Sequence, residues 1–161
     1  MKIGFKRVHP YAKLPVYAHN GDAGMDVYAV ENCELFPFTP TLVKTGLIAE
    51  IPSGYELQVR PRSGMALKEG ITVWNAPGTI DSGYRSEIGV ILFWAPKCWI
   101  CTTSETGDAM LKSKELGSKL ILKGDRIAQL VVAPVTKCVP VEVTEVSETD
   151  RGTGGFGSTG V

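Results

Sequence analysis

Short runs of β-branched and aromatic residues, separated by Gly, Pro and Asn, recur along most of this chain and limit what it can fold into. Such runs are typical of strands that end in turns. The run Tyr55–Arg60 also alternates apolar and polar residues with the period of two expected for a half-buried strand. The expected strands are Met25–Val30, Thr41–Ile51, Tyr55–Arg60, Glu87–Trp94, Arg126–Val135 and Val139–Val146. The pattern predicts an all-β fold, a jelly-roll-like barrel or sandwich.

Helical signals are few. Ser63–Lys68 could form one or two helical turns, and Ser104–Ser118 could be a helix or a loop. With 161 residues, the chain suits one domain whose core needs no disulfides. We expect a β domain over residues 1–146 and a flexible C-terminal arm over residues 147–161.

The 17 basic and 17 acidic residues give a formal net charge of zero. This balance argues against a protein that holds polymeric nucleic acid through its overall field, although a few arginines could still meet a small anionic substrate. The first residues lack an apolar signal region, and no stretch is long enough to span a membrane. We therefore expect a cytoplasmic protein without a membrane partner, whose four cysteines are reduced.

The C-terminal arm, SETDRGTGGFGSTGV from Ser147 onward, contains five glycines and cannot bury enough apolar area to become ordered by itself. One interpretation is a floppy terminus. The other is an arm that becomes ordered over a ligand, in which bare backbone N–H groups join Arg151, Ser158 and Thr159 in a phosphate cradle.

Two segments have the residue types of a substrate site. In RPRSGMALKEG (Arg60–Gly70), an arginine precedes Ser-Gly at the start of a short helix, so that a guanidinium, a hydroxyl and exposed N–H groups could meet one anion. A serine N-cap beside a solvated arginine is the alternative. In NAPGTIDSGYR (Asn75–Arg85), a strand enters a tight hairpin, where Asp81 and Tyr84 could serve a sugar or Asp81 could only form the turn.

Two further segments each open an apolar strand with polar residues. DAGMDV (Asp22–Val27) contains Asp26, and KGDRIAQLVV (Lys123–Val132) contains Arg126 and Gln129. Each pattern is ordinary when taken alone.

Taken in order, DAGMDVYA, RPRSGMA, NAPGTIDSGYRSEIGV, GDRIAQLV and RGTGGFGSTG closely resemble the five motifs of the trimeric dUTP pyrophosphatase (dUTPase) family. The resemblance extends from Leu14 to Gly160 with one interruption. It implies a jelly-roll homotrimer in which each active site is assembled from three subunits and closed by the arm. It also implies an enzyme that uses Mg2+ to hydrolyse dUTP to dUMP and pyrophosphate, which limits uracil incorporation into DNA and supplies dUMP for dTMP synthesis.

By this resemblance, Asp81 would be the catalytic residue, holding the attacking water and contacting the 3′-hydroxyl of deoxyribose. Tyr84 would lie against the sugar and leave no room for a 2′-hydroxyl. Uracil would be read by the hairpin and its return strand, through Asn75, Gly78, Thr79, Ile80, Asp81 and Gly89.

The resemblance also indicates which residues would bind the triphosphate and the metal. Asp26 would steady Mg2+ through its waters, which suits a cation that dehydrates reluctantly. Phe156, followed by Gly157, would stack on uracil. The expected phosphate ligands are Arg62, Ser63, Gly64 and Gln129, together with Arg151 and Ser158 of the arm.

The chain departs from the family pattern between the third and fourth motifs, where an insertion at about Ala95–Ser118 makes it roughly twenty residues longer. Phage-type members of the family sometimes carry inserts at this place, so a viral or mobile-element origin, and with it a host cytoplasm, is compatible with the sequence. The insertion contains CWIC (Cys98–Cys101), expected to be strand cysteines in an extended hairpin, with a Zn2+ site or a redox pair as alternatives. Ser86 stands where glycine is usual, which affects only local hairpin geometry.

Two other functions remain open at this point. A dCTP deaminase shares the fold and the phosphate-binding segments, but its return strand carries a glutamate where this chain has Ile91, and it tends to have tryptophan in place of Tyr84. A regulatory protein could instead engage a protein partner through the insertion while nucleotide closes the arm. The enzymatic and regulatory roles could coexist.

Overall fold

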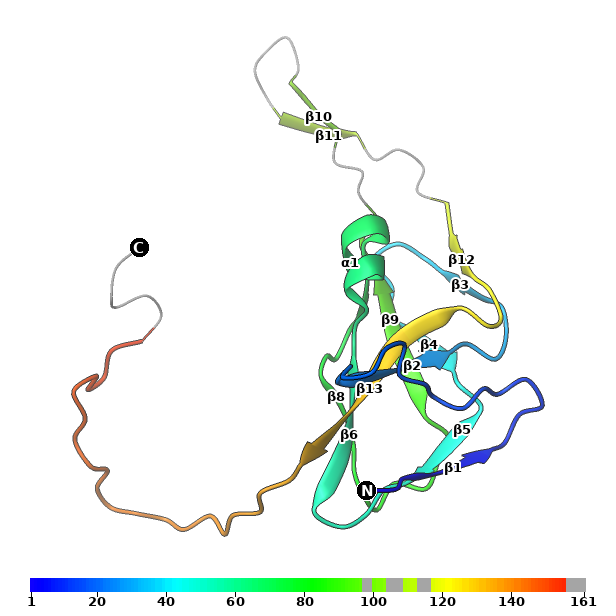
Figure 1. The fold of residues 1–161 in the computed structure, drawn as a ribbon. Helices are drawn as coiled ribbons and strands as arrows, with labels where there is room; N and C mark the ends of the chain where they lie inside the picture. The colour runs from blue at the N-terminus through cyan, green and yellow to red at the C-terminus, as the bar shows by residue number, and fades with distance from the viewer. Residues whose placement is uncertain (97–99, 104–108, 113–116, 156–161) are drawn as a thin grey trace.

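The computed structural model describes residues 1–96, 100–103, 109–112 and 117–155, in which the chain forms thirteen strands and one short helix (Figure 1). No helix in these residues is long and apolar enough to cross a membrane. The elements are β1 (Gly4–Arg7), β2 (Gly24–Tyr28), β3 (Cys33–Leu35), β4 (Thr41–Lys44), β5 (Leu47–Glu50), β6 (Tyr55–Arg60), α1 (Ser63–Glu69), β7 (Ile71–Val73), β8 (Gly78–Ile80), β9 (Gly89–Trp94), β10 (Ile100–Thr103), β11 (Ala109–Lys112), β12 (Lys119–Ile121) and β13 (Arg126–Pro134).

The strands form two main antiparallel sheets. One has the order β2-β13-β6-β8 and the other the order β4-β9-β7, while β1 pairs with β5 and β12 pairs with β3 at the margins. Neighbours in each sheet are mostly distant in sequence, as in a jelly roll. The predicted all-β, jelly-roll-like fold is therefore confirmed.

The core lies between these sheets and follows the two-residue period of the strands. In β9, Val90 and Leu92 are fully buried while Ile91 and Phe93 are partly exposed. Burying one such side chain stabilises the fold by about 1.5–3 kcal/mol. The four-stranded sheet contributes Val27, Leu57 and Leu130 to the same cluster that receives Val43, Ile71 and Leu92 from the three-stranded sheet.

Most predicted strands are confirmed, but Thr41–Ile51 is two strands rather than one. Thr45 and Gly46 separate β4 from β5, and Gly46 has a positive φ of 68°. A Cβ at this position would lie 2.7 Å from Cβ of His9, so the turn has space only for glycine. An apolar run that reads as one strand is thus divided by tertiary packing.

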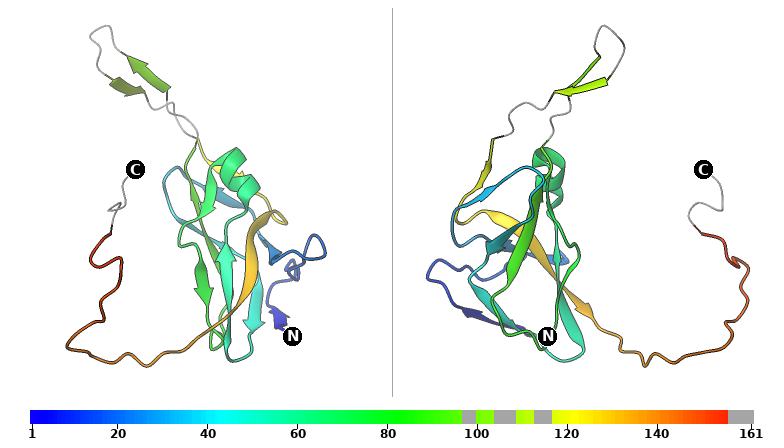
Figure 2. Two further views of the ribbon diagram at one scale, coloured as in Figure 1. Left: turned by 60° about the vertical axis from the view of Figure 1, so that its left-hand side comes forward. Right: turned by 180° about the vertical axis from the view of Figure 1, so that it is seen from behind.

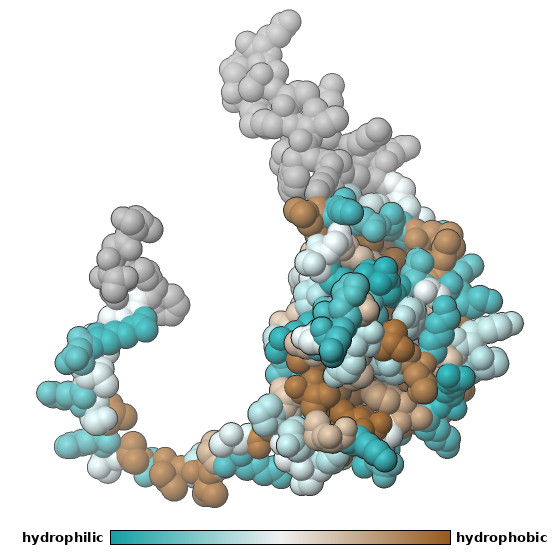
Figure 3. Space-filling view, in the orientation of Figure 1, coloured by the Kyte–Doolittle hydropathy of each residue, from teal (hydrophilic) through white to brown (hydrophobic). Residues whose placement is uncertain are grey.

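The prediction of a strand at Val139–Val146 is wrong. After β13 the chain leaves the domain at the end opposite α1 and runs outward without strand pairing (Figure 2). Val139, Val141 and Val143 nevertheless keep strand-like alternation and are 85%, 75% and 59% exposed. The apolar side chains are visible along this segment in Figure 3. The pattern of a strand is present, but no described part of the same chain covers it.

The expected insertion projects beyond α1 as a hairpin of β10 and β11, which pair with no other described strand (Figure 1). A helix over 104–118 is wrong where the structure describes it, because β11 lies there; residues 104–108 and 113–116 lie outside the described part. Cys101 is a strand residue, as expected, whereas Cys98 lies outside the described residues.

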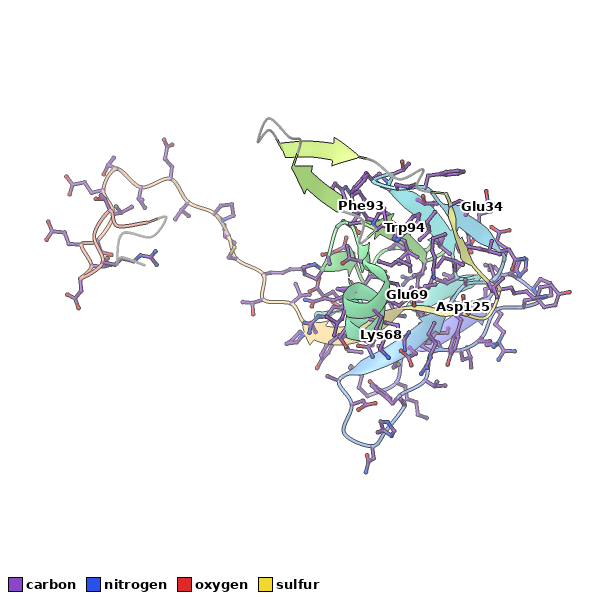
Figure 4. All side chains as sticks on the ribbon, turned by 90° about the horizontal axis from the view of Figure 1, so that it is seen from above. Glu34, Lys68, Glu69, Phe93, Trp94 and Asp125 are labelled. Atoms are coloured by element: carbon purple, nitrogen blue, oxygen red, sulfur yellow. The ribbon has the colours of Figure 1, made fainter. Side chains whose placement is uncertain are left out.

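Both stems of the insertion are tied to the end of α1, where Figure 4 shows Glu69 and Trp94. The indole Nε1 of Trp94 donates to the carbonyl of Glu69 at 3.1 Å, and the Ala95 N–H donates to the carbonyl of Gly70 at 2.8 Å. On the returning stem, Nζ of Lys119 lies 2.7 Å from Oε2 of Glu69. The insertion thus enters and leaves the domain at one anchored place.

Candidate active site

A pocket of about 170 Å³ opens where β6, β8 and β9 meet the hairpin that follows β8. Antiparallel pairing of β8 with β6 places Gly78 opposite Val59. The lining residues are Val59, Asn75, Gly78, Thr79, Ile80, Tyr84 and Gly89. Six of these seven were predicted as substrate residues from the sequence, and the structure brings them together.

Val59 is the lining residue that sequence reasoning missed. It is a buried position of a regular strand and carries no chemical signal of its own. A Cβ at Gly78 would lie 3.3 Å from Cβ of Val59 and 3.1 Å from Nδ2 of Asn75. The absence of a side chain at Gly78 therefore keeps this wall of the pocket close to the backbone.

The hairpin presents two polar side chains beside the pocket. Asp81 directly follows β8, is exposed, and its carboxylate accepts no hydrogen bond from another described residue. Its carbonyl accepts from the Tyr84 N–H at 3.0 Å, closing the turn. The Tyr84 hydroxyl donates to the carbonyl of Glu87 at 3.1 Å. The Asp81 carboxylate is thus exposed to solvent, whereas the Tyr84 phenol is held by a hydrogen bond.

Strand β6 connects this pocket to a second cluster of predicted residues. It pairs with β8 on one side and with β13 on the other, which places Arg60 opposite Gln129. The chain then passes directly into Arg62, where α1 begins. One strand therefore positions the pocket wall and leads to the expected phosphate ligands.

Asp26 is the centre of this cluster and is only 4% exposed. Its Oδ1 lies 3.2 Å from Nε of Arg62, and its Oδ2 lies 3.1 Å from Nη1 of Arg126. Arg62 also donates from Nη1 to the carbonyl of Arg126 at 3.2 Å. One buried carboxylate thus holds two guanidinium groups, and the three side chains together carry one net positive charge.

A β-bulge explains how Arg126 reaches this cluster. Arg126 lies opposite Tyr28, but the register shifts so that Ala128 lies opposite Val27. The extra residue leaves Ile127 and Ala128 both buried and redirects the side chain at the start of the strand. Arg126 had no predicted role, and the consecutive apolar residues after it were the only signal of the bulge.

At the start of α1, Ser63 and Gly64 are exposed, and the expected one or two helical turns are present. The alternative of a serine N-cap beside a solvated arginine is wrong. The N-cap residue is Arg62, which makes no side-chain cap hydrogen bond because a guanidinium has no acceptor; it is paired with Asp26 instead. The first turn therefore keeps its N–H groups and the Ser63 hydroxyl available to a ligand.

The described part of the arm, residues 147–155, lies apart from the β domain within one protomer (Figure 2). Arg151 is exposed and donates from Nε to the carbonyl of Gly154 at 2.8 Å. Phe156, Gly157 and Ser158 lie outside the described residues.

No group of three or more His, Cys, Asp or Glu residues in the described part of the chain could hold a metal ion. Burial raises the pKa of the Cys33 thiol, and the Glu31 and Glu34 carboxylates raise it further. Because metals bind the thiolate, this environment disfavours Cys33 as a ligand. A metal held entirely by protein side chains therefore has no basis in these residues.

Comparison with known proteins identifies the family. The family model described as dUTPase matches residues 10–105 and 118–160, and the interval between these parts lies inside the expected insertion. A deoxyuridine 5′-triphosphate nucleotidohydrolase from Picosynechococcus sp. is 47% identical over 160 residues, 99% of each chain. Because this relative matches nearly end to end, the extra length is not peculiar to this chain.

Solved structures agree. The dUTPase of Staphylococcus bacteriophage 80alpha with dUPNHPP matches with a TM-score of 0.81 and 31% identity over 99% of each chain. A variant of the dUTPase from phage phi11 of S. aureus, described with a structural Mg(II) ion, matches with a TM-score of 0.73 and 26% identity over 90% of this chain and 98% of that one. The fold is thus that of an enzyme domain built on a jelly roll. The chain belongs to the dUTPase family.

The buried ion-pair cluster leads to a prediction about stability. Asp26→Asn should lower the free energy of unfolding by about 1.5–3 kcal/mol, because an amide would replace a charged acceptor and place a donor against a guanidinium. Urea denaturation at fixed protein concentration measures this loss. Asp22→Asn is the matched control, since Asp22 accepts only one backbone N–H, from His19 at 2.8 Å. Equal stability of the two variants would contradict the account of Asp26.

Proposed function

We propose that this protein hydrolyses dUTP to dUMP and pyrophosphate in the cytoplasm. The observation that carries the proposal is the joining of two sites by β6. A backbone-walled pocket for a base lies on one side, and an arginine cluster with net positive charge lies where the same strand leads into α1. Membership of the dUTPase family gives the substrate.

Uracil would occupy the pocket walled by the Asn75–Ile80 backbone and Gly89. Fixed backbone donors and acceptors can match uracil and mismatch cytosine, and a site that leaves polar groups unpaired rejects the wrong base strongly. Tyr84 would lie against the deoxyribose, where its ring leaves no space for a 2′-hydroxyl.

The phosphates would be bound beyond β6. Arg62 would act with Ser63 and Gly64 at the start of α1, and Gln129 would join from β13. Planar guanidinium groups suit this task because they donate in pairs to phosphate oxygens. Arg126 is added to the sequence-based assignment, since it shares Asp26 with Arg62.

Mg2+ would arrive as the magnesium complex of the nucleotide, since the described residues form no metal cage. Both carboxylate oxygens of Asp26 accept from guanidinium groups, yet each has a second lone pair that could accept from metal-bound water. The residues present therefore fit a cation held mainly by phosphate oxygens and water, with Asp26 in contact through water. Bound there, the cation would draw charge from the α-phosphate.

Asp81 would orient the attacking water and take its proton. The water oxygen forms a bond to the α-phosphorus while the bridging bond to the β-phosphate breaks. The products are then dUMP and pyrophosphate. Asp81 suits this role because its exposed carboxylate has no partner among the described residues and follows the strand that lines the pocket.

We also propose a homotrimer with shared active sites, supported by two exposed apolar surfaces. On the outer side of β4-β9-β7, Leu42 is 62% exposed and Trp74 is 56% exposed, and the Trp74 and Phe93 rings stack with centroids 4.2 Å apart. The valines of residues 139–146 form the second surface. Exposed patches of this kind mark protein interfaces, and a neighbouring copy would cover both.

In such an assembly the arm would close over a neighbour's pocket. Phe156 would stack on uracil beside Gly157, while Arg151 and Ser158 would bind the γ-phosphate. The outward course of the chain after β13 supports this arrangement, since the arm, as far as residue 155, lies away from the β domain of its own protomer (Figure 2).

The direct test is pyrophosphate release from dUTP, UTP and each other deoxynucleoside triphosphate, with and without Mg2+. We expect release from dUTP alone and only with Mg2+. Production of dUMP and ammonia from dCTP would instead establish a deaminase.

Asp81→Asn should still bind dUTP but lose turnover by about 10²–10⁴-fold, because the amide keeps the shape of the side chain and cannot accept the proton. Binding is measured with a non-hydrolysable analogue and turnover by pyrophosphate release. Asp22→Asn, which changes a turn carboxylate outside the site, should retain wild-type turnover. Full activity of Asp81→Asn would remove Asp81 as the base.

Truncation after Ser147 should leave a folded trimer that hydrolyses dUTP at least about tenfold more slowly, since base stacking by an aromatic residue alone is worth about 1–3 kcal/mol. Light scattering gives the mass of the assembly, and kcat/KM gives the effect on hydrolysis. Removal of Val161 alone is the control. Normal kcat/KM after the long truncation would rule out the closing arm.

A second role, in binding a protein partner, is favoured by the insertion. The β10–β11 hairpin pairs with no other described strand and is anchored at both stems, as expected of an appendage that the domain does not need. The similar phage 80alpha enzyme belongs to dUTPases described as controlling transfer of virulence genes. We propose that the insertion is a partner-binding element separate from catalysis.

Deletion of residues 97–116, joining Pro96 to Gly117, should leave kcat/KM for dUTP unchanged. A protein that co-purifies with the full chain should be lost from this variant. Reduced hydrolysis would place the insertion in the catalytic machinery, and a retained partner would remove its binding role.

A further inference from the structure

Glu87 joins the substrate hairpin to the body of the domain through two different atoms. Its side-chain Oε1 accepts the N–H of Gly46 at 2.7 Å, and its backbone carbonyl accepts the hydroxyl of Tyr84 at 3.1 Å. The carboxylate is partly buried, and Gly46 is distant in sequence, in the turn between β4 and β5. One residue thus contacts both a fixed turn and the phenol beside the pocket.

The turn that receives the Glu87 side chain is tightly fixed. A Cβ at Gly46 would lie 2.7–2.8 Å from side-chain atoms of His9, Ala12 and Val30, so these side chains pack closely against the turn. The carbonyl of Gly46 also accepts the N–H of Val8 at 2.8 Å. Glu87 is therefore anchored to a rigid part of the fold.

A neighbouring contact fixes the strand that follows Glu87. Thr45 is fully buried, and its hydroxyl donates to the carbonyl of Ile88 at 2.7 Å. The Ile88 N–H donates to the carbonyl of Leu47 at 2.7 Å. These bonds hold the Glu87–Ile88 peptide unit and the start of the strand that follows. Among the described residues, the Glu87 side chain adds the contact nearest the hairpin, to Gly46.

Tyr84 needs such a tie because it is otherwise loosely held. It is 43% exposed, and the residues from Asp81 to Ser86 around it are mostly exposed as well. Its ring lines the pocket, while its hydroxyl bonds to the Glu87 carbonyl. That carbonyl is held by two contacts: the Ile88 N–H of the same peptide unit donates to Leu47, and the Glu87 side chain accepts from Gly46. The carboxylate is the contact on the hairpin side, so its loss would let residue 87 and the Tyr84 ring shift.

We propose that Glu87 is a positioning residue that holds Tyr84 against the sugar and thereby sets the preference for deoxyribose over ribose. The inference rests on the proposed function, in which Tyr84 excludes the 2′-hydroxyl. Glu87 itself touches no substrate. Its effect is indirect, through Tyr84. If the Tyr84 ring were free to tilt, the site would have space for the 2′-hydroxyl of ribose.

The test compares kcat/KM for dUTP and UTP in Glu87→Ala and Glu87→Gln. Loss of the acceptor in the alanine variant should lower the dUTP/UTP ratio by about tenfold, the order that hydrophobic and steric pockets give for one extra group. The glutamine variant keeps an amide oxygen that can accept the Gly46 N–H, so its ratio should equal that of the wild type. Equal ratios in all three proteins, or equal losses in both variants, would overturn the proposal.

Tyr84→Phe provides a second test that leaves Glu87 unchanged. It removes only the hydroxyl that donates to the Glu87 carbonyl, and it should lower the ratio as Glu87→Ala does. The double variant should show no further loss, because both changes interrupt one connection. An unchanged ratio in Tyr84→Phe, or additive losses in the double variant, would contradict the route through Tyr84, even if Glu87→Ala alone fails to fold.

Asn32→Ala is the matched control for general loosening. The Asn32 side chain also accepts a backbone N–H from a distant segment, that of Lys123 at 2.9 Å, but it lies outside the pocket. The dUTP/UTP ratio of kcat/KM in Asn32→Ala should equal that of the wild type. A decrease as large as that in Glu87→Ala would show that Glu87 has no specific role. A wild-type protein that leaves dUTP intact would refute the proposed function instead, so the two failures are distinguishable.

Discussion

The site depends on one strand that is hydrogen bonded on both sides. Because β6 pairs with β8 and with β13, it fixes the pocket and the arginine cluster relative to each other. Its buried residues, Leu57 and Val59, belong to the core, so the spacing between the two halves of the site is set by the same packing that stabilises the domain. A substrate with a base at one end and phosphates at the other requires such a fixed separation.

The buried negative charge of Asp26, close to this strand, is balanced by two arginines. A carboxylate this deeply buried would be costly without partners, and each of its oxygens has a guanidinium. The arrangement also links β2, the start of α1 and β13, three segments that are far apart in the sequence. Arg62 is thereby held in place without a ligand, which would reduce the ordering that the proposed phosphate binding must impose.

Local patterns predicted much of this structure. The alternation in Tyr55–Arg60 gave β6 with its observed bounds. The family resemblance named Asn75, Gly78, Thr79, Ile80 and Tyr84, which line one pocket, and Asp81, which lies beside it. The errors arose where neighbours in space decide the outcome. Gly46 divides an apolar run because other side chains surround it, and the valines after β13 have the pattern of a strand but no partner within the described chain.

The roles of Arg126 and Glu87 were not predictable for a similar reason. Arg126 reaches Asp26 only because a bulge shifts the register, and Glu87 matters through a turn that precedes it by about forty residues. Neither residue differs in type from an ordinary surface charge. Sequence patterns report the chemistry available along the chain, whereas register and contacts between distant segments decide which groups meet.

The stems of the insertion have a consequence for how this chain could diversify. Trp94 and Lys119 both bond to Glu69, so these contacts hold the two stems of the insertion and do not involve the β10–β11 hairpin between them. Evolution can therefore lengthen, shorten or replace what lies between them without rebuilding the enzyme. The end of α1 thus serves as an attachment site, and related proteins could differ mainly in the segment that is inserted at this place.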